Sequence, residues 1–161
     1  MRQSRFVTMI GAAGVGKSGV ALVVFGQLRG AYPDGVCFND VAATTDPRHL
    51  PAALAAVLGL SVVSSNPLRN LTTFLAGRRM LLILANCEHM VAATAILAET
   101  ILKGAPDIAI IATSREPLRA EGEAVDRLQP MKSPSATEPP TAAEALSFPS
   151  VQLFVQPAGE A

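Results

Sequence analysis

The sequence has 161 residues, half of them apolar, and this length and composition favour one domain with a buried core. Lysine plus arginine and aspartate plus glutamate number 13 each, so the formal net charge is zero and no basic excess supports direct nucleic-acid binding by this segment. The longest apolar runs are shorter than the roughly 18 residues of a membrane span, and the N-terminus lacks the pattern of a signal peptide.

The first predicted element is a short β-strand, Phe6–Ile10, which leads directly into a glycine-rich segment at Gly11–Ser18. This segment reads Gly-Ala-Ala-Gly-Val-Gly-Lys-Ser and matches the phosphate-binding P-loop (Walker A) pattern at every defined position. A helix-compatible run, Gly19–Leu28, follows it. Glycines let consecutive backbone N–H groups turn toward one anion, and the N-terminus of the next helix adds partial positive charge.

The P-loop pattern predicts a nucleotide phosphate site, with Lys17 reaching the β- and γ-phosphates and Ser18 binding Mg²⁺. The alternative is a glycine-rich turn that contains a lysine by chance. The residues predicted to contact nucleotide through this loop are Gly11, Gly14, Val15, Gly16, Lys17, Ser18 and Gly19.

Between the P-loop helix and the middle of the chain, the sequence predicts one strand and two helices. The strand is Val36–Val41. Asp46 and Pro47 supply a helix N-cap and first residue for a helix through Leu58. Pro51 within its first turns conflicts with this start, so the start could slip by a few residues. Asn66 and Pro67 repeat the signal for a helix that ends before Gly77.

The second half of the predicted domain contains two continuous apolar runs, Met80–Ala85 and Ile108–Thr113, typical of strands buried on both faces. A helix, Val91–Leu102, separates them, and Ala124–Leu128 is a short last strand. Alternating strands and helices predict an α/β domain with a mainly parallel sheet over residues 1–129, whose ligand site lies at the carboxyl ends of the strands. The proline-rich residues 130–149 are expected to form a linker or loop, and residues 150–161 the start of a helix or a tail.

Several candidate residues follow the buried strands. Cys37 and Cys87 lie in or beside apolar runs without the spacing of a zinc site, and we expect buried, reduced thiols in a cytoplasmic protein. The first buried strand ends at Ala85, where a P-loop enzyme normally has an aspartate for Mg²⁺. Asn86 could ligate the metal weakly through its amide oxygen, and Glu88, three residues after Ala85, could swing in toward it, but Glu88 is interpreted as a solvated carboxylate or a helix cap. Arg115 follows the next strand and is either a sensor of the γ-phosphate or a surface residue paired with Glu116.

Taken together, these segments resemble the nucleotide-binding domain of STAND-class (NB-ARC-like) P-loop ATPases, which in bacteria occur within large transcriptional regulators. The resemblance implies a three-layer P-loop NTPase fold that binds ATP or ADP with Mg²⁺, uses Arg115 as the sensor, and acts as a switch in signal transduction. The segments that carry the resemblance are Val7–Ser18, Tyr32–Val36, Leu81–Met90, Ala112–Leu118 and Ser150–Val155. The stretches Asn86–His89 and Thr113–Leu118 are far more specific than the P-loop alone.

The sequence departs from this family at three places. Ala85 aligns with the Walker B aspartate, which predicts weakened Mg²⁺ binding and weak or absent hydrolysis. The adenine-side segment before the first strand and the helical and winged-helix parts after Ala161 are missing, so the domain is expected to be incomplete at both ends.

Three functions are compatible with these features. The first is an ATP/ADP-binding switch domain. The second is a degenerate, non-catalytic interaction module that binds no nucleotide usefully. A catalytic kinase or GTPase is the third, although the sequence has neither an Asn-Lys-x-Asp motif nor an arginine-rich lid.

Overall fold

The computed structural model describes residues 4–60, 66–129, 141 and 144, and its contacts separate Met1–Leu128 from Gln129–Ala161. The fold described below is that of the first unit. Apart from Thr141 and Glu144, the expected linker at 130–149 and the expected helix start or tail at 150–161 lie outside the described residues, as does the Ser150–Val155 segment. These assignments stay predictions.

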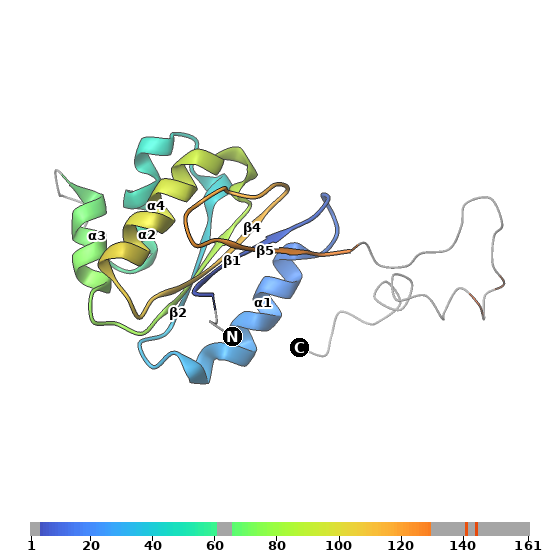
Figure 1. Ribbon diagram of the computed structural model, residues 1–161, viewed down its shortest axis with the longest axis horizontal. Coiled ribbons are helices and arrows are strands. Elements are labelled where there is room, and N and C mark those ends of the chain that lie inside the picture. The colour runs from blue at the N-terminus through green and yellow to red at the C-terminus, as the bar shows by residue number, and fades with distance from the viewer. Residues whose placement is uncertain (1–3, 61–65, 130–140, 142–143, 145–161) are drawn as a thin grey trace. The chain divides into compact units, whose positions relative to one another are not determined.

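Strands and helices alternate along most of the first unit (Figure 1), except for two consecutive helices near its middle and two consecutive strands at its end. The predicted strands are present with small shifts at their ends. Short 3-10 turns connect several of them, at Arg29–Ala31, Val41–Ala43, Pro47–His49 and Cys87–His89. No helix in the described ranges is long and apolar enough to cross a bilayer. The main elements in chain order are β1 (Phe6–Ile10), α1 (Lys17–Leu28), β2 (Val36–Asp40), α2 (Leu50–Val57), α3 (Pro67–Leu75), β3 (Leu81–Ala85), α4 (Val91–Gly104), β4 (Ala109–Ser114) and β5 (Ala124–Arg127).

The five strands form one sheet in the order β2-β3-β4-β1-β5, and every neighbouring pair is parallel. This confirms the predicted α/β class with a mainly parallel sheet. Because parallel strands share one carboxyl edge, the segments that follow β1, β3 and β4 meet there although they are far apart in sequence. In register, Ile10 of β1 pairs with Ser114 of β4, and Leu84 of β3 pairs with Ala112 of β4.

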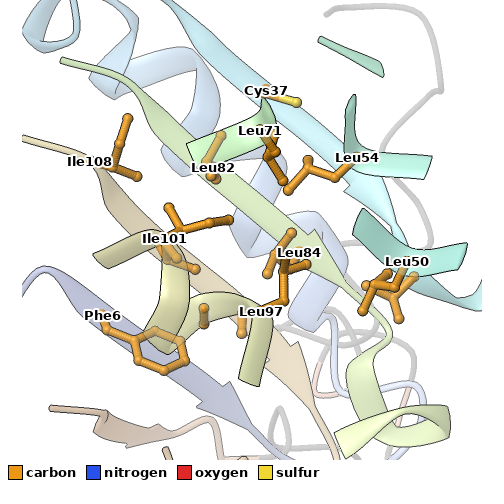
Figure 2. Packing of buried hydrophobic residues seen from close by; sticks show 14 of the residues in the cluster. Phe6, Cys37, Leu50, Leu54, Leu71, Leu82, Leu84, Leu97, Ile101 and Ile108 are labelled. Atoms are coloured by element: carbon orange, nitrogen blue, oxygen red, sulfur yellow. The ribbon is translucent and has the colours of Figure 1, made fainter. Parts of the chain in front are cut away.

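Helices cover both faces of the sheet and make three layers (Figure 1). On one face Leu82 and Leu84 pack in a cluster with buried residues of α2, α3 and α4 (Figure 2). On the other face Leu81 and Ile83 pack with Ala21 of α1. Successive side chains of a strand point to opposite faces. Since both faces of β3 are buried, all five of its residues are apolar instead of alternating.

The pairs Asp46–Pro47 and Asn66–Pro67, which predict helix starts, have different outcomes in the structure. Asp46 accepts a hydrogen bond from the Arg48 N–H at 2.9 Å, but it caps only the 3-10 turn at Pro47–His49. The α-helix begins at Leu50, which leaves Pro51 in its first turn, where proline is tolerated. The predicted start at Asp46–Pro47 is therefore displaced. By contrast, Asn66 accepts from the Arg69 N–H at 3.0 Å and caps α3 as predicted.

Both cysteines are buried free thiols, as the sequence predicts. Burial raises the pKa of Cys37 to about 11 and the pKa of Cys87 to about 12, although hydrogen bonding of Cys87 partly opposes this rise. The Cys87 Sγ also donates to the Leu84 carbonyl oxygen at 3.2 Å.

We expect these raised pKa values to make both thiols slow to react in the folded protein. At pH 8 an unfolded cysteine is partly thiolate, whereas a thiol with a pKa two units higher has about a hundredfold less of the reactive form. Labelling with a disulfide reagent at pH 8 should therefore be at least about a hundredfold slower in the native than in the urea-unfolded protein. Equal rates in the two states would contradict this burial.

Candidate phosphate-binding site

The Gly11–Ser18 loop lies at the carboxyl edge of the sheet, between the end of β1 and the start of α1. Gly14 and Gly16 have φ angles of 78° and 92°, which side chains other than glycine rarely adopt. Helix α1 begins at Lys17 within the loop motif, and its first backbone N–H groups have no partner inside the helix. The loop therefore brings together the two features that bind anions at helix N-termini, free N–H groups and the positive end of the helix dipole.

Lys17 is the buried cation of this loop. The residue is 7 % exposed, and its ammonium donates to the carbonyl oxygens of Gly11 at 2.8 Å and Ala12 at 2.9 Å. These two hydrogen bonds offset part of the cost of removing the charge from water. The ammonium is thus held at the loop, where an approaching phosphate would meet a positive charge already in place.

The loop opens onto a cavity of about 370 Å³. Of the residues predicted to contact nucleotide, Gly11 and Val15 belong to the loop without lining this cavity, whereas the others line it. Arg115, which follows β4, is among them, so the fold brings it to the P-loop as predicted from its position after a buried strand. The lining residues are Ala13, Gly14, Gly16, Lys17, Ser18, Gly19, Asn86, Glu88 and Arg115.

The segment that follows β3 supplies two further lining residues, Asn86 and Glu88. Ala85 is fully buried, and strand alternation places it with Leu81 and Ile83 on the face covered by α1. Its methyl group offers no oxygen to a metal ion. Asn86 follows in the left-handed conformation, with φ 58°, which turns the chain sharply at the strand end.

Two hydrogen bonds anchor Asn86 to neighbouring strands. Its backbone N–H donates to the Thr113 hydroxyl oxygen at 3.1 Å, and its side-chain amide donates to a carboxylate oxygen of Asp40 at 2.9 Å. The 3-10 turn at Cys87–His89 starts from this anchored residue. The turn carries Glu88 to the cavity.

Glu88 forms an ion pair with Arg115 across the cavity wall, with 3.2 Å between the Glu88 Oε1 and the Arg115 Nε. The interpretation of Glu88 as a solvated carboxylate or helix cap is wrong, because its side chain is only 13 % exposed and helix α4 has no side-chain cap. The alternative pairing of Arg115 with Glu116 is also replaced, since the structure shows Glu88 as the ion-pair partner. Sequence spacing did not reveal this contact because the two residues follow different strands.

The site fits Mg²⁺ only as a companion of bound phosphates. Within the described ranges, no group of three or more histidine, cysteine, aspartate or glutamate residues could hold a metal by itself. Ser18 offers a hydroxyl, and the buried Oε2 of Glu88 has no hydrogen-bond partner among the described residues. Mg²⁺ is commonly bound through one or two carboxylates plus substrate phosphates, so this donor set is compatible with a nucleotide-bound ion.

The parallel sheet and the loop between β1 and α1 define this unit as an α/β domain of the P-loop NTPase class. Its fold is similar to a chain of the Drosophila ORC bound to DNA, with a TM-score of 0.59 and 14% identity over 77% of this chain and 37% of that chain. It is also similar to the Aeropyrum pernix ORC2 protein in its ADPNP and ADP complexes, with a TM-score of 0.58 and 14% identity over 80% of this chain and 42% of that chain. At this identity the likeness concerns the fold alone.

Sequence relatives occur in mycobacteria. Proteins of Mycobacterium tuberculosis and Mycobacterium bovis, both named "Putative HTH-type transcriptional regulator", are 37% identical over 134 residues. An uncharacterized protein of M. tuberculosis is 30% identical over 132 residues, which cover 81% of this chain and 34% of that protein. The match to the regulators covers 81% of this chain and 15% of their length, so the chain spans a small part of these relatives. No protein-family model matches the chain.

Proposed function

We propose that this chain is an adenine-nucleotide-binding switch domain with weak or absent hydrolysis, of the STAND (NB-ARC-like) kind. The observation that carries the proposal is the cavity in which the P-loop, Lys17, Ser18 and Arg115 come together at the carboxyl edge of the sheet. Backbone N–H groups at a helix N-terminus and positively charged side chains are the groups that bind polyphosphates. The likeness to ORC chains, one of them solved with ADPNP and ADP, supports an adenine nucleotide as the ligand.

In this proposal the loop residues have distinct roles. Backbone N–H groups of Gly14 to Gly19 bind the phosphates, Lys17 neutralises their charge, and Arg115 contacts the γ-phosphate with its planar guanidinium. Ser18 would hold Mg²⁺, which supplies charge neutralisation between the phosphates when bound. ADP and ATP would then differ in whether Arg115 has a partner on the nucleotide.

The names of the mycobacterial relatives support a place for such a domain within a transcriptional regulator, and a cytoplasmic location is part of our proposal. Since the chain has no net positive charge, we assign it no role in contacting DNA. Its partner in our proposal is the nucleotide.

Nucleotide selectivity tests this function. A fluorescent ADP analogue bound to the protein should be displaced by ATP and ADP at micromolar to low millimolar concentrations and by GTP only at higher ones. Displacement by inorganic triphosphate as effectively as by ATP would show that no base is recognised. Absence of any binding would instead favour the non-catalytic interaction module.

Replacing Ala85 by aspartate is expected to raise Mg²⁺-dependent ATP hydrolysis by about tenfold or more, because it would restore a carboxylate at the end of the buried strand, on the sheet face that α1 covers, to help hold the ion. The measurement is phosphate release under saturating ATP, with thermal unfolding of Ala85→Asp as the check on folding. Lys17→Ala in the same background should remove the gain. Substantial turnover by the unmodified chain, lost in Lys17→Ala, would contradict weak hydrolysis.

A further inference from the structure

The Glu88–Arg115 ion pair joins a rigid residue to a flexible one. Glu88 is mostly buried and sits on the turn that Asn86 anchors to β2 and β4 through two hydrogen bonds. The side chain of Arg115 is 59 % exposed, and long exposed side chains sample many rotamers. The carboxylate is therefore the fixed partner, and the guanidinium is the group whose freedom the pair restricts.

The contact also leaves most of the guanidinium available. It joins the Glu88 Oε1 to the Arg115 Nε, and the described residues supply no hydrogen bond to either terminal nitrogen of Arg115. Both side chains line the phosphate cavity in this paired arrangement. An arginine bound through Nε keeps its two terminal NH₂ groups free for a phosphate, which matches the bidentate geometry of such contacts.

We propose that Glu88 is a positioning residue, which holds Arg115 in the cavity so that its terminal nitrogens meet the γ-phosphate of ATP. This inference rests on the proposed function and specifies how the site distinguishes ATP from ADP. Fixing a flexible arginine before binding removes part of the entropy cost of ordering it on the ligand. This gain in affinity applies only to a nucleotide that contacts Arg115. It therefore strengthens the binding of ATP, which has a γ-phosphate, relative to ADP.

Two other roles for Glu88 make different predictions. A carboxylate that binds Mg²⁺ would affect ATP affinity only in the presence of the ion. A carboxylate that merely stabilises the fold, or changes the local charge, would affect ATP and ADP alike and would act whether or not Arg115 is present. These differences define the experiment.

The test measures dissociation constants of ATP and ADP by calorimetry, in Mg²⁺ and in EDTA, for the wild type, Glu88→Gln, Arg115→Gln and the double variant. Glu88→Gln should weaken ATP binding by about three- to tenfold, in both buffers, and change ADP binding by less than about twofold. In the Arg115→Gln background the same change should have no further effect. Glu116→Gln is the matched control, because it removes an exposed carboxylate beside Arg115 without touching the pair.

Several results would overturn the positioning role. These are a loss of ATP affinity confined to the Mg²⁺ buffer, an equal loss for ADP, and an effect that persists in the double variant. If the wild type binds ATP and ADP but Glu88→Gln changes neither, the positioning role fails while the nucleotide-binding function stands. If no variant binds either nucleotide, the proposed function fails with it.

Discussion

Replacing Lys17 by alanine is expected to weaken ATP binding by about a hundredfold or more, since it removes the buried cation of the P-loop cavity. The loss of ATP affinity should exceed the loss caused by removing any exposed charge. The Lys17 ammonium already lies against the loop, where it donates hydrogen bonds to the Gly11 and Ala12 carbonyl oxygens. Competition against a fluorescent ADP analogue measures the effect. Circular dichroism and thermal unfolding show whether the variant keeps its fold.

Lys103→Ala is the control for this experiment. Lys103 is an exposed lysine near the end of α4 that pairs with Glu121, and it does not line the phosphate cavity. Its replacement changes the net charge by the same amount and should alter the ATP dissociation constant by less than about twofold. A folded Lys17→Ala protein that binds ATP as well as Lys103→Ala would contradict the assignment of the loop as the phosphate site.

Replacing Leu82 by alanine is expected to lower the free energy of unfolding by about 3 kcal/mol, the typical cost of emptying a fully buried leucine site. Leu82 has no exposed surface, and its strand lies between β2 and β4. It packs in the larger cluster with the helices of that face (Figure 2). Urea denaturation followed by circular dichroism gives the change directly.

Val57→Ala provides the comparison, because Val57 ends helix α2 and is 53% exposed. Its truncation should cost less than about 0.5 kcal/mol. If the two variants lost equal amounts of unfolding free energy, β3 would not be the centre of the core. A loss of ATP binding in folded Leu82→Ala would also indicate that the core and the cavity are coupled.

Local sequence patterns were enough to predict the sheet and one half of the site. Met80–Ala85 and Ile108–Thr113 are continuous apolar runs because strands β3 and β4 are central in the sheet. The P-loop is a contiguous motif, and its glycines, lysine and serine determine the local backbone conformation and the positions of the phosphate-binding groups. Arg115 was also predictable as a candidate, since a residue just after a buried parallel strand must lie at the carboxyl edge.

The other half of the site depends on contacts between distant residues. Asn86 adopts a left-handed conformation that its type permits but does not require, and two hydrogen bonds to other strands hold it there. Only this turn brings Glu88 to Arg115. A pattern within a single segment contains no information about that pairing, which explains why Glu88 was assigned as a solvated or capping residue.

The α-helix α2 begins at Leu50, later than the predicted start at Asp46–Pro47, for a local reason. Asp46–Pro47 is a valid N-terminal signal, but Pro51 lacks the N–H that a helix continuing from Pro47 would require. The chain resolves the conflict with a 3-10 turn followed by a new helix start. The two signals together, rather than the first alone, indicate the observed boundary.

Calorimetric titration of the unmodified chain with ADP and with ATP, each in the presence of Mg²⁺, tests the central claim most directly. We expect saturable, one-to-one binding of both nucleotides with dissociation constants below about 1 mM, and no detectable phosphate release during the titration. No heat of binding at millimolar concentrations of either nucleotide would contradict the assignment of the Gly11–Ser18 loop and its cavity as a nucleotide site.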